Sequence, residues 1–125
     1  MTVIVVSDSS PLIYLAALCD FPLLPRLFGR VVIPPAVWRE VVEEGRGGPG
    51  EEAVRQACED GWLNVIPLHD PPAPIRVGGH ELHAGETEVI RLAAQNSADI
   101  LLMDDRPAVL HARSLGYRVA PTIAI

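Results

Sequence analysis

Residues 98–106 read A-D-I-L-L-M-D-D-R, an apolar run followed at once by two adjacent carboxylates. The run predicts a short buried strand, and Asp104 and Asp105 stand where that strand ends. Residues 3–6 form a second apolar run, which ends in the same way at Asp8. Because ligands of open α/β sheets bind beyond the carboxyl ends of the strands, these two runs predict an acidic site at one sheet edge.

A divalent cation is the simplest partner for such an edge. Carboxylates that lie close together raise one another's pKa, so a cluster of them is hard to keep ionised without a cation. The alternative is that each aspartate only caps the helix that follows it, which aspartate does well. The repetition of the pattern on two separate strands favours the cation site.

Strands and helices alternate along the rest of the sequence with short connections, a pattern typical of βαβ units around a parallel sheet. We expect strands at 3–6, 31–33, 63–66, 99–103 and 117–119, and helices at about 11–18, 20–28, 34–44, 51–60, 85–96 and 107–115. Ser10 is the expected N-cap of the first helix, with Pro11 at its first position. Residues 67–79, with four prolines and two glycines, predict an irregular surface crossing. The expected fold is one three-layer α/β/α domain over residues 1–125, with a central parallel sheet of four to five strands.

Composition excludes several classes of protein. No apolar stretch is long enough to span a membrane, and the first residues hold no basic leader, so we expect a soluble cytoplasmic protein. Cys19 and Cys58 match no metal motif and are expected to be reduced. The net charge is −6, and all ten basic residues are arginine. This balance argues against a module that holds nucleic acid by a basic patch, but less against a nuclease, whose acids can bind cations.

Glu86 has the clearest position among the remaining acids. On the predicted helix 85–96 it shares a face with the apolar residues at offsets of three, four and seven, which are Val89, Ile90 and Ala93. Glu88 falls on the opposite face. An acid in the first turn also complements the helix dipole, but the dipole does not require the buried side. A functional role for Glu86 is therefore favoured.

Two other patterns stay open. Glu40 and Glu44 both flank the apolar face of the predicted helix 34–44, and periodicity does not choose between them. His80, His83 and Glu86 could suggest a zinc site, but their spacing differs from H-E-x-x-H and the last member leaves the common face. The sequence contains no G-x-S-x-G, P-loop or G-x-G-x-x-G motif, so serine-hydrolase and nucleotide-binding functions lack their usual motifs.

Four motifs, in order and at fitting intervals, together resemble the PIN-domain ribonucleases of the VapC-like toxin type. They are D-S-S-P-L-I at 8–13, I-P-P-A-V-W-R-E-V at 33–41, G-E-T-E-V-I at 85–90 and L-L-M-D-D-R at 101–106. Each motif is weak alone, but four in sequence across nearly the whole chain are specific. The resemblance implies a parallel sheet flanked by helices, RNA cleavage that depends on Mg²⁺ or Mn²⁺, and a role as the toxin of a type II toxin–antitoxin pair.

The resemblance also implies roles for single residues. The catalytic acids would be Asp8, Glu40, Glu86 and Asp105, which selects Glu40 over Glu44. Asp8, Glu86 and Asp105 would be metal ligands, directly or through water, with Asp104 as a neighbouring helper and Glu40 as a ligand or a residue that orients the water.

Two further residues are candidates for contact with the substrate: Ser10 matches a small polar residue of the family near the metal, and Arg106 lies next to the acids. Ser10 would lie near the metal, although its expected capping role explains it equally well. Arg106 would contact a substrate phosphate, although an ion pair at the start of a helix is the simpler explanation.

The resemblance implies a cognate antitoxin as protein partner, which would lay a helix or an extended segment across the acidic groove. The apolar residues 11–28 could form part of that interface or of a homodimer, and core packing is the simpler use. Family members usually continue beyond the last strand, whereas this sequence ends at Ile125. The alternative function is a PIN-like protein that binds nucleic acid or regulates a partner with little or no cleavage.

Overall fold

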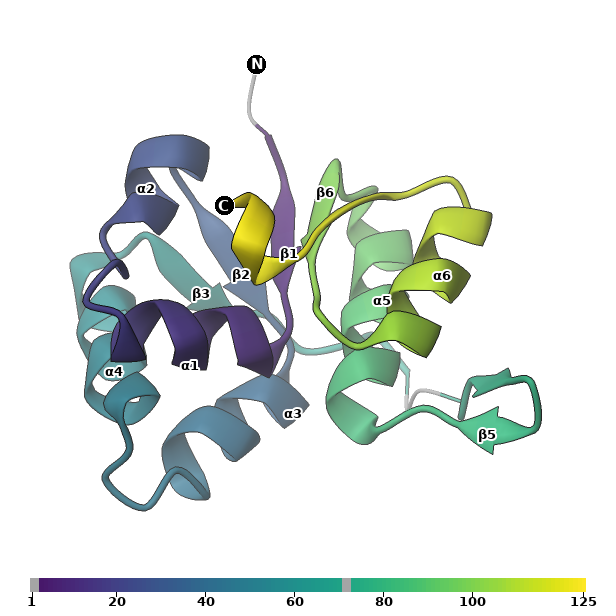
Figure 1. Cartoon of the computed structure of the whole chain (residues 1–125), viewed down its shortest axis with the longest axis horizontal. Helices are drawn as coiled ribbons and strands as arrows, with labels where there is room; N and C mark the ends of the chain where they lie inside the picture. Colours follow the sequence, from purple (N-terminus) through teal and green to yellow (C-terminus); the bar gives the residue numbers. More distant parts are fainter. Residues whose placement is uncertain (1–2, 71–72) are drawn as a thin grey trace.

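A parallel sheet of five strands in the order β3-β2-β1-β6-β7 forms the centre of the structure (Figure 1). The structure is a computed structural model that describes residues 3–70 and 73–125. The strands are β1 (Val5–Ser7), β2 (Val31–Ile33), β3 (Leu63–Val65), β6 (Ile100–Leu102) and β7 (Arg118–Ala120). Apart from the buried Ser7, the inner strands β1, β2 and β6 are apolar, and they are largely buried, as strands covered on both faces require.

The central strand β1 sets the two acidic ends beside each other. It pairs in parallel with β2 on one side and β6 on the other, with Val6 opposite both Val32 and Leu101. The pairing continues beyond β1, because the Asp8 N–H donates to the carbonyl of Leu102 at 2.9 Å. The carboxyl ends of β1 and β6 therefore lie side by side.

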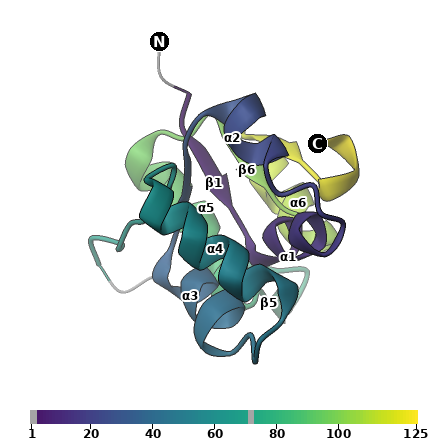
Figure 2. The same ribbon diagram turned by 90° about the vertical axis from the view of Figure 1, so that its left-hand side faces the viewer.

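Helices cover both faces of this sheet. Those on the way to β2 and β3 are α1 (Ser9–Ala17), α2 (Leu23–Phe28), α3 (Pro35–Trp38) and α4 (Pro49–Asp60), and those that precede β6 and β7 are α5 (Ala84–Asn96) and α6 (Arg106–Ser114). Parallel crossovers are right-handed, so building outward from β1 in two directions places the two groups on opposite faces. Figures 1 and 2 show α4 and α5 on opposite sides of β1. The predicted three-layer α/β/α fold is confirmed.

Buried apolar side chains hold the first turns of α1 and α5 at the carboxyl edge of the sheet. On α5 the buried face is the predicted one, with Val89, Ile90 and Ala93 each at most 2% exposed. On α1, Leu12 and Leu15 are buried against the same core. Full burial of one such leucine or valine stabilises the fold by roughly 1.5–3 kcal/mol. None of the helices in the described ranges is long and apolar enough to cross a membrane.

Two helix starts differ from the sequence predictions. Helix α1 begins at Ser9 with Asp8 as its N-cap, so the prediction of Ser10 as N-cap was wrong. The reason is that the Asp8 carboxylate accepts the Ser9 N–H at 2.8 Å, which starts the helix earlier. Helix 34–44 is divided: it is α-helical over α3 and then π-helical over η1 (Arg39–Glu43), where the Glu44 N–H donates to the carbonyl of Arg39.

A β-hairpin lies in the crossing that was predicted to be irregular. Its strands are β4 (Arg76–Val77) and β5 (His80–Glu81), which pair in antiparallel fashion. Gly78 and Gly79 join them with φ of 57° and 84°. A two-residue turn with both φ values positive suits glycine and matches the twist of a hairpin. Residues 71 and 72 of the crossing lie outside the described residues.

Candidate acidic active site

Four carboxylates from four elements gather at the carboxyl edge of the sheet. Asp8 follows β1, Glu40 lies on η1, Glu86 lies in the first turn of α5, and Asp105 immediately precedes α6. Burial raises the pKa of Asp8, and Glu86, Glu40 and Asp105 each raise it further through charge repulsion. The structure thus brings together the four acids that were chosen from the sequence.

A cavity of about 530 Å³ opens beside these acids. Its lining residues are Asp8, Ser9, Ser10, Ile13, Glu40, Glu44, His83 and Glu86. Carboxylates and hydroxyls therefore make up most of the wall. Glu44 belongs to this wall as well, so both glutamates that periodicity left open face the cavity.

Asp8 is the most strongly perturbed acid of the group. Its side chain is buried, at 6% exposed, and this burial raises its pKa from 3.8 to about 7. The hydrogen bond from the Ser9 N–H lowers the pKa, but burial and the three neighbouring acids outweigh it. At neutral pH the Asp8 carboxylate is therefore only partly ionised, and a nearby cation would favour its ionised form.

Glu40 is held in place by a contact that the sequence did not indicate. The Ser9 hydroxyl donates to Oε2 of Glu40 at 2.8 Å. The other carboxylate oxygen of Glu40 faces the start of α5, where a Cβ on Gly85 would lie 2.7 Å from Oε1 of Glu40 and 3.2 Å from Oδ1 of Asp8. Only glycine lets α5 approach this closely. The adjacent serines after Asp8 and the glycine before Glu86 were the signals that could have indicated these roles.

Glu86 and Asp105 combine capping with a place in the cluster. Oε1 of Glu86 accepts the N–H of His83 at 3.0 Å, and Oδ2 of Asp105 accepts the N–H of Ala108 at 3.3 Å. Burial raises the pKa of Glu86, and its neighbour Asp105 raises it further, while the His83 hydrogen bond lowers it. Capping and clustering, the two roles that the sequence set against each other, therefore coexist in the same side chains.

Asp104 faces a different part of the molecule. Its Oδ1 accepts the N–H of Thr122 at 2.7 Å, and its Oδ2 accepts the Thr122 hydroxyl at 2.6 Å. It thereby holds the C-terminal helix η2 (Thr122–Ala124) and lines an apolar cavity with Tyr14 and Leu18. This placement separates Asp104 from Asp105, although the two are neighbours in the sequence.

The remaining candidates are more exposed. Ser10 is half-buried and lines the acidic cavity, and Arg106 is an exposed residue at the start of α6, beside Asp105. Glu88, predicted to lie on the face opposite Glu86, makes a structural contact there. Its Oε1 accepts the N–H of Ala36 at 3.0 Å, which fastens α5 to the start of α3.

The donor set is suited to a hard divalent cation. Carboxylate oxygens are the ligands that Mg²⁺ and Mn²⁺ prefer, and the mutually repelling acids fit a bound positive charge. Within residues 3–70 and 73–125, no three His, Cys, Asp or Glu side chains are already arranged to hold an ion. This holds for the set of His80, His83 and Glu86 as well as for the four clustered acids. The hydrogen bonds from Ser9 to Asp8 and to Glu40 each use one carboxylate oxygen, so the second oxygen of each acid is left to coordinate a cation.

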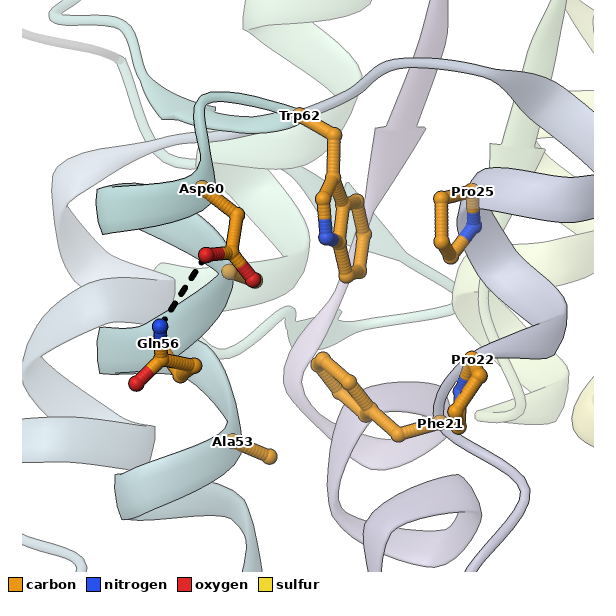
Figure 3. A pocket seen from close by; sticks show the side chains of 8 residues that line it. Phe21, Pro22, Pro25, Ala53, Gln56, Asp60 and Trp62 are labelled. Atoms are coloured by element: carbon orange, nitrogen blue, oxygen red, sulfur yellow. Dashed lines mark hydrogen bonds between the residues drawn. The ribbon is translucent and has the colours of Figure 1, made fainter.

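A separate apolar cavity of about 280 Å³ lies between α2 and α4 (Figure 3). The rings of Phe21 and Trp62 contact each other in it at a tilt of 51°, with centroids 5.5 Å apart, and Gln56 donates to Asp60 at 3.0 Å. None of the four clustered acids lines this cavity.

The buried leucines of residues 11–28 pack into the hydrophobic core. Core packing was the simpler of the uses considered for this region.

Solved structures share this fold. A PilT N-terminus domain protein from the archaeon Sulfolobus solfataricus P2 is 21% identical, with a TM-score of 0.68 over 96% of this chain and 87% of that one. The PIN domain endonuclease Utp24 is 16% identical, with a TM-score of 0.62 over 94% and 84%. A domain of a functionally unknown protein from Methanocaldococcus jannaschii DSM 2661 is 19% identical, with a TM-score of 0.61 over 95% and 90%.

These likenesses show the fold alone, because the sequences are so different. No functionally curated protein matches the chain. A family model does match it: DUF3368, described as a PIN domain, aligns with residues 4–125. This match covers the sheet, its helices and all four clustered acids. The chain therefore belongs to the PIN-domain family, whose members are metal-dependent nucleases.

Proposed function

We propose that this chain is a divalent-metal-dependent endoribonuclease that serves as the toxin of a type II toxin–antitoxin pair. The observation that carries the nuclease proposal is the gathering of Asp8, Glu40, Glu86 and Asp105 at one sheet edge, where burial and mutual repulsion raise the pKa of Asp8 to about 7. Repulsion between the ionised acids destabilises the folded chain unless a cation binds to them. A cation bound by carboxylates can catalyse the hydrolysis of phosphodiesters.

The residues have distinct proposed roles. Asp8, Glu86 and Asp105 would hold Mg²⁺ or Mn²⁺, and Glu40 would bind it or orient water. A cation bound there would supply a water of lowered pKa and neutralise charge that develops on the phosphate. Ser9 fixes the direction of Glu40 through its 2.8 Å hydrogen bond. Ser10 and Arg106, at the cavity wall and beside Asp105, are proposed to contact the substrate.

Cleavage of single-stranded RNA by the purified protein tests the nuclease proposal. We expect cleavage with Mn²⁺ or Mg²⁺ and none with EDTA. Asp8→Asn and Asp105→Asn should each lower the rate at least about 100-fold, because each removes a charged oxygen donor from the cluster. Asp60→Asn is the matched control, since Asp60 is exposed at the end of α4 and outside the cavity. If both site variants cleave at the wild-type rate, the assignment of the site is wrong.

The toxin role rests on the resemblance of the four motifs to VapC-like proteins. Its test is growth of a bacterial host after induction of the chain alone. We expect growth arrest with the wild-type chain and normal growth with Asp105→Asn at equal protein level. A wild-type chain that cleaves RNA in vitro but leaves growth unaffected would argue for a nuclease with another biological role.

The alternative is a PIN-like protein that binds nucleic acid or regulates a partner without cleavage. One observation favours it: the described side chains do not already form a three-residue metal site. Binding of Mn²⁺ decides between the two. If the chain is a nuclease, the wild-type protein should bind Mn²⁺ through Asp8, and Asp8→Asn should lose this binding. If it is a binding protein without catalysis, the wild-type protein and Asp8→Asn should bind Mn²⁺ equally weakly.

A further inference from the structure

The β4–β5 hairpin stands apart from the central sheet and next to the acidic site. Its two strands pair only with each other within the described parts of the chain. β4 packs against α6, whose first residue, Arg106, follows Asp105. β5 leads through Leu82 into His83, which lines the acidic cavity. Figure 1 shows the hairpin protruding beside the starts of α5 and α6.

The segment that contains the hairpin supplies nitrogen donors at the side of the acidic cavity. Of the eight residues that line the cavity, His83 alone has a nitrogen donor in its side chain. Arg76 on the hairpin is exposed, whereas His80 lies across from Val77 and therefore points to the other face of the hairpin. A polyanion that approaches four carboxylates on a chain of net charge −6 requires cationic or donor groups close by. Arg76 and His83 lie on one continuous segment at the side of the site.

We propose that residues 76–83 form the phosphate-binding wall of the site, where Arg76 holds a phosphate of single-stranded RNA that flanks the cleaved bond. His83 donates an N–H to the phosphate that enters the cavity, so it acts as a positioning residue. The two-glycine turn keeps the hairpin short and leaves its polar residues open to solvent. This inference rests on the proposed nuclease function for its substrate.

One residue of the hairpin opposes this binding. Glu81 lies directly across from Arg76 in the antiparallel pair, and opposite charges in that position attract each other. Glu81 therefore competes with phosphate for the guanidinium group and adds a negative charge beside the RNA. Its removal should tighten RNA binding, an effect opposite to that of removing Arg76.

Fluorescence anisotropy with a labelled single-stranded RNA of mixed sequence tests the wall. The protein carries Asp8→Asn, and EDTA is present, so that RNA stays intact. We expect Arg76→Ala and His83→Ala each to weaken binding roughly fivefold to tenfold, and Arg76→Ala to lower the slope of log Kd against log salt by about 0.7. Glu81→Gln should tighten binding about twofold, and His83→Gln, which keeps an N–H donor, should bind better than His83→Ala.

The matched control is Arg118→Ala, an exposed arginine on β7 that pairs with the first residue of β6, at the opposite end of the strands from the acids. Its RNA affinity should equal that of the parent. Equal affinity of Arg76→Ala and Arg118→Ala, or no RNA binding by the parent, would overturn the inference. Unchanged melting temperatures would show that the exposed substitutions leave the fold intact.

Cleavage by the otherwise wild-type chain separates this inference from the proposed function. Arg76→Ala and His83→Ala should raise KM for RNA and change kcat little, because they position the substrate. If RNA binding depends on the hairpin but no metal supports cleavage, only the nuclease proposal fails. If the chain cleaves RNA but the hairpin variants bind RNA as tightly as the parent does, only the proposal of a phosphate-binding wall is wrong.

Discussion

The hydroxyl of Ser9 donates a 2.8 Å hydrogen bond to the carboxylate of Glu40, across 31 positions of the sequence. This bond joins the first residue of α1 to the π-helical segment η1. It directs one oxygen of Glu40 toward Ser9 and leaves the other near Asp8 and the start of α5. A π-helical turn often marks a functional site, and here it sets the direction of one acid of the cluster.

Ser9→Ala should therefore lower RNA cleavage while the chain stays folded. A hydrogen bond to a charged group contributes about 1.5–3 kcal/mol. If the Ser9 bond holds Glu40 in its catalytic position, its loss should lower the cleavage rate roughly tenfold or more. The measurement is kcat with Mn²⁺. Ser114→Ala, which removes an exposed hydroxyl at the end of α6, is the control. Wild-type kcat for Ser9→Ala would show that the Ser9 bond does not position Glu40 for catalysis.

Gly85→Ala should separate activity from stability. The added methyl would lie 2.7 Å from Oε1 of Glu40, which can move because it is the far end of a flexible side chain. Alanine is also the better helix former by about 0.5–1 kcal/mol. We expect a melting temperature equal to or above that of wild type, with cleavage reduced roughly 100-fold.

Gly48→Ala adds the same methyl at the N-cap of α4, outside the acidic cavity, and should leave cleavage unchanged. A Gly85→Ala protein that unfolds would point to a backbone requirement at this position. One that cleaves normally would show that Glu40 and Asp8 need not approach α5.

The sheet and most helices could be predicted because their causes are local. Short windows of the sequence show the apolar runs of strand length and the breaks at proline and glycine. They also show the apolar stripe of α5 at Val89, Ile90 and Ala93. The hairpin at 76–81 was missed because proline-rich flanks hid its Gly78-Gly79 turn. The π-helical turn at η1 was missed because apolar periodicity does not distinguish it from an α-helix.

Asp8 and the Asp104–Asp105 pair could be found in the sequence because parallel strands deliver their carboxyl ends to one edge, and Glu86 because it lies on the buried face of its helix. The choice of Glu40, and of Asp105 over Asp104, came from the family resemblance. The contacts that orient those acids could not be predicted. The bond from Ser9 to Glu40 joins residues from separate elements, and the close approach of Gly85 depends on how α5 packs against the sheet. The different surroundings of Asp104 and Asp105 likewise depend on where the chain turns after β6.

Asp104→Asn and Asp105→Asn should therefore have opposite effects. Asp104→Asn weakens the two bonds that hold Thr122, so we expect a loss of about 1–2 kcal/mol in the free energy of unfolding and retained cleavage. Asp105→Asn should keep most of the stability and lose cleavage. Thermal unfolding and RNA cleavage measure the two effects. Loss of cleavage by folded Asp104→Asn would place this residue in the active site after all.

Stability should fall as pH rises through the window set by Asp8. Its pKa is about 7 in the folded chain, against 3.8 as the ordinary value, so between these values the folded chain binds more protons than the unfolded one. The raised pKa of Glu86 acts in the same direction. Without divalent cations, we expect the free energy of unfolding to decrease from about pH 4 to pH 7, by on the order of a few kcal/mol, and the loss to remain at pH 8.

Asp8→Asn removes the buried charge, so at pH 8 it should melt above wild type in EDTA, while at pH 4 the two should melt together. Mg²⁺ or Mn²⁺ should raise the melting temperature of wild type more at pH 8 than at pH 5, because protonated acids release the cation. Asp60→Asn removes an equal charge from the exposed end of α4 and serves as the control. A wild-type chain whose stability rises from pH 4 to pH 7 in EDTA would show that Asp8 is already ionised and compensated without a cation.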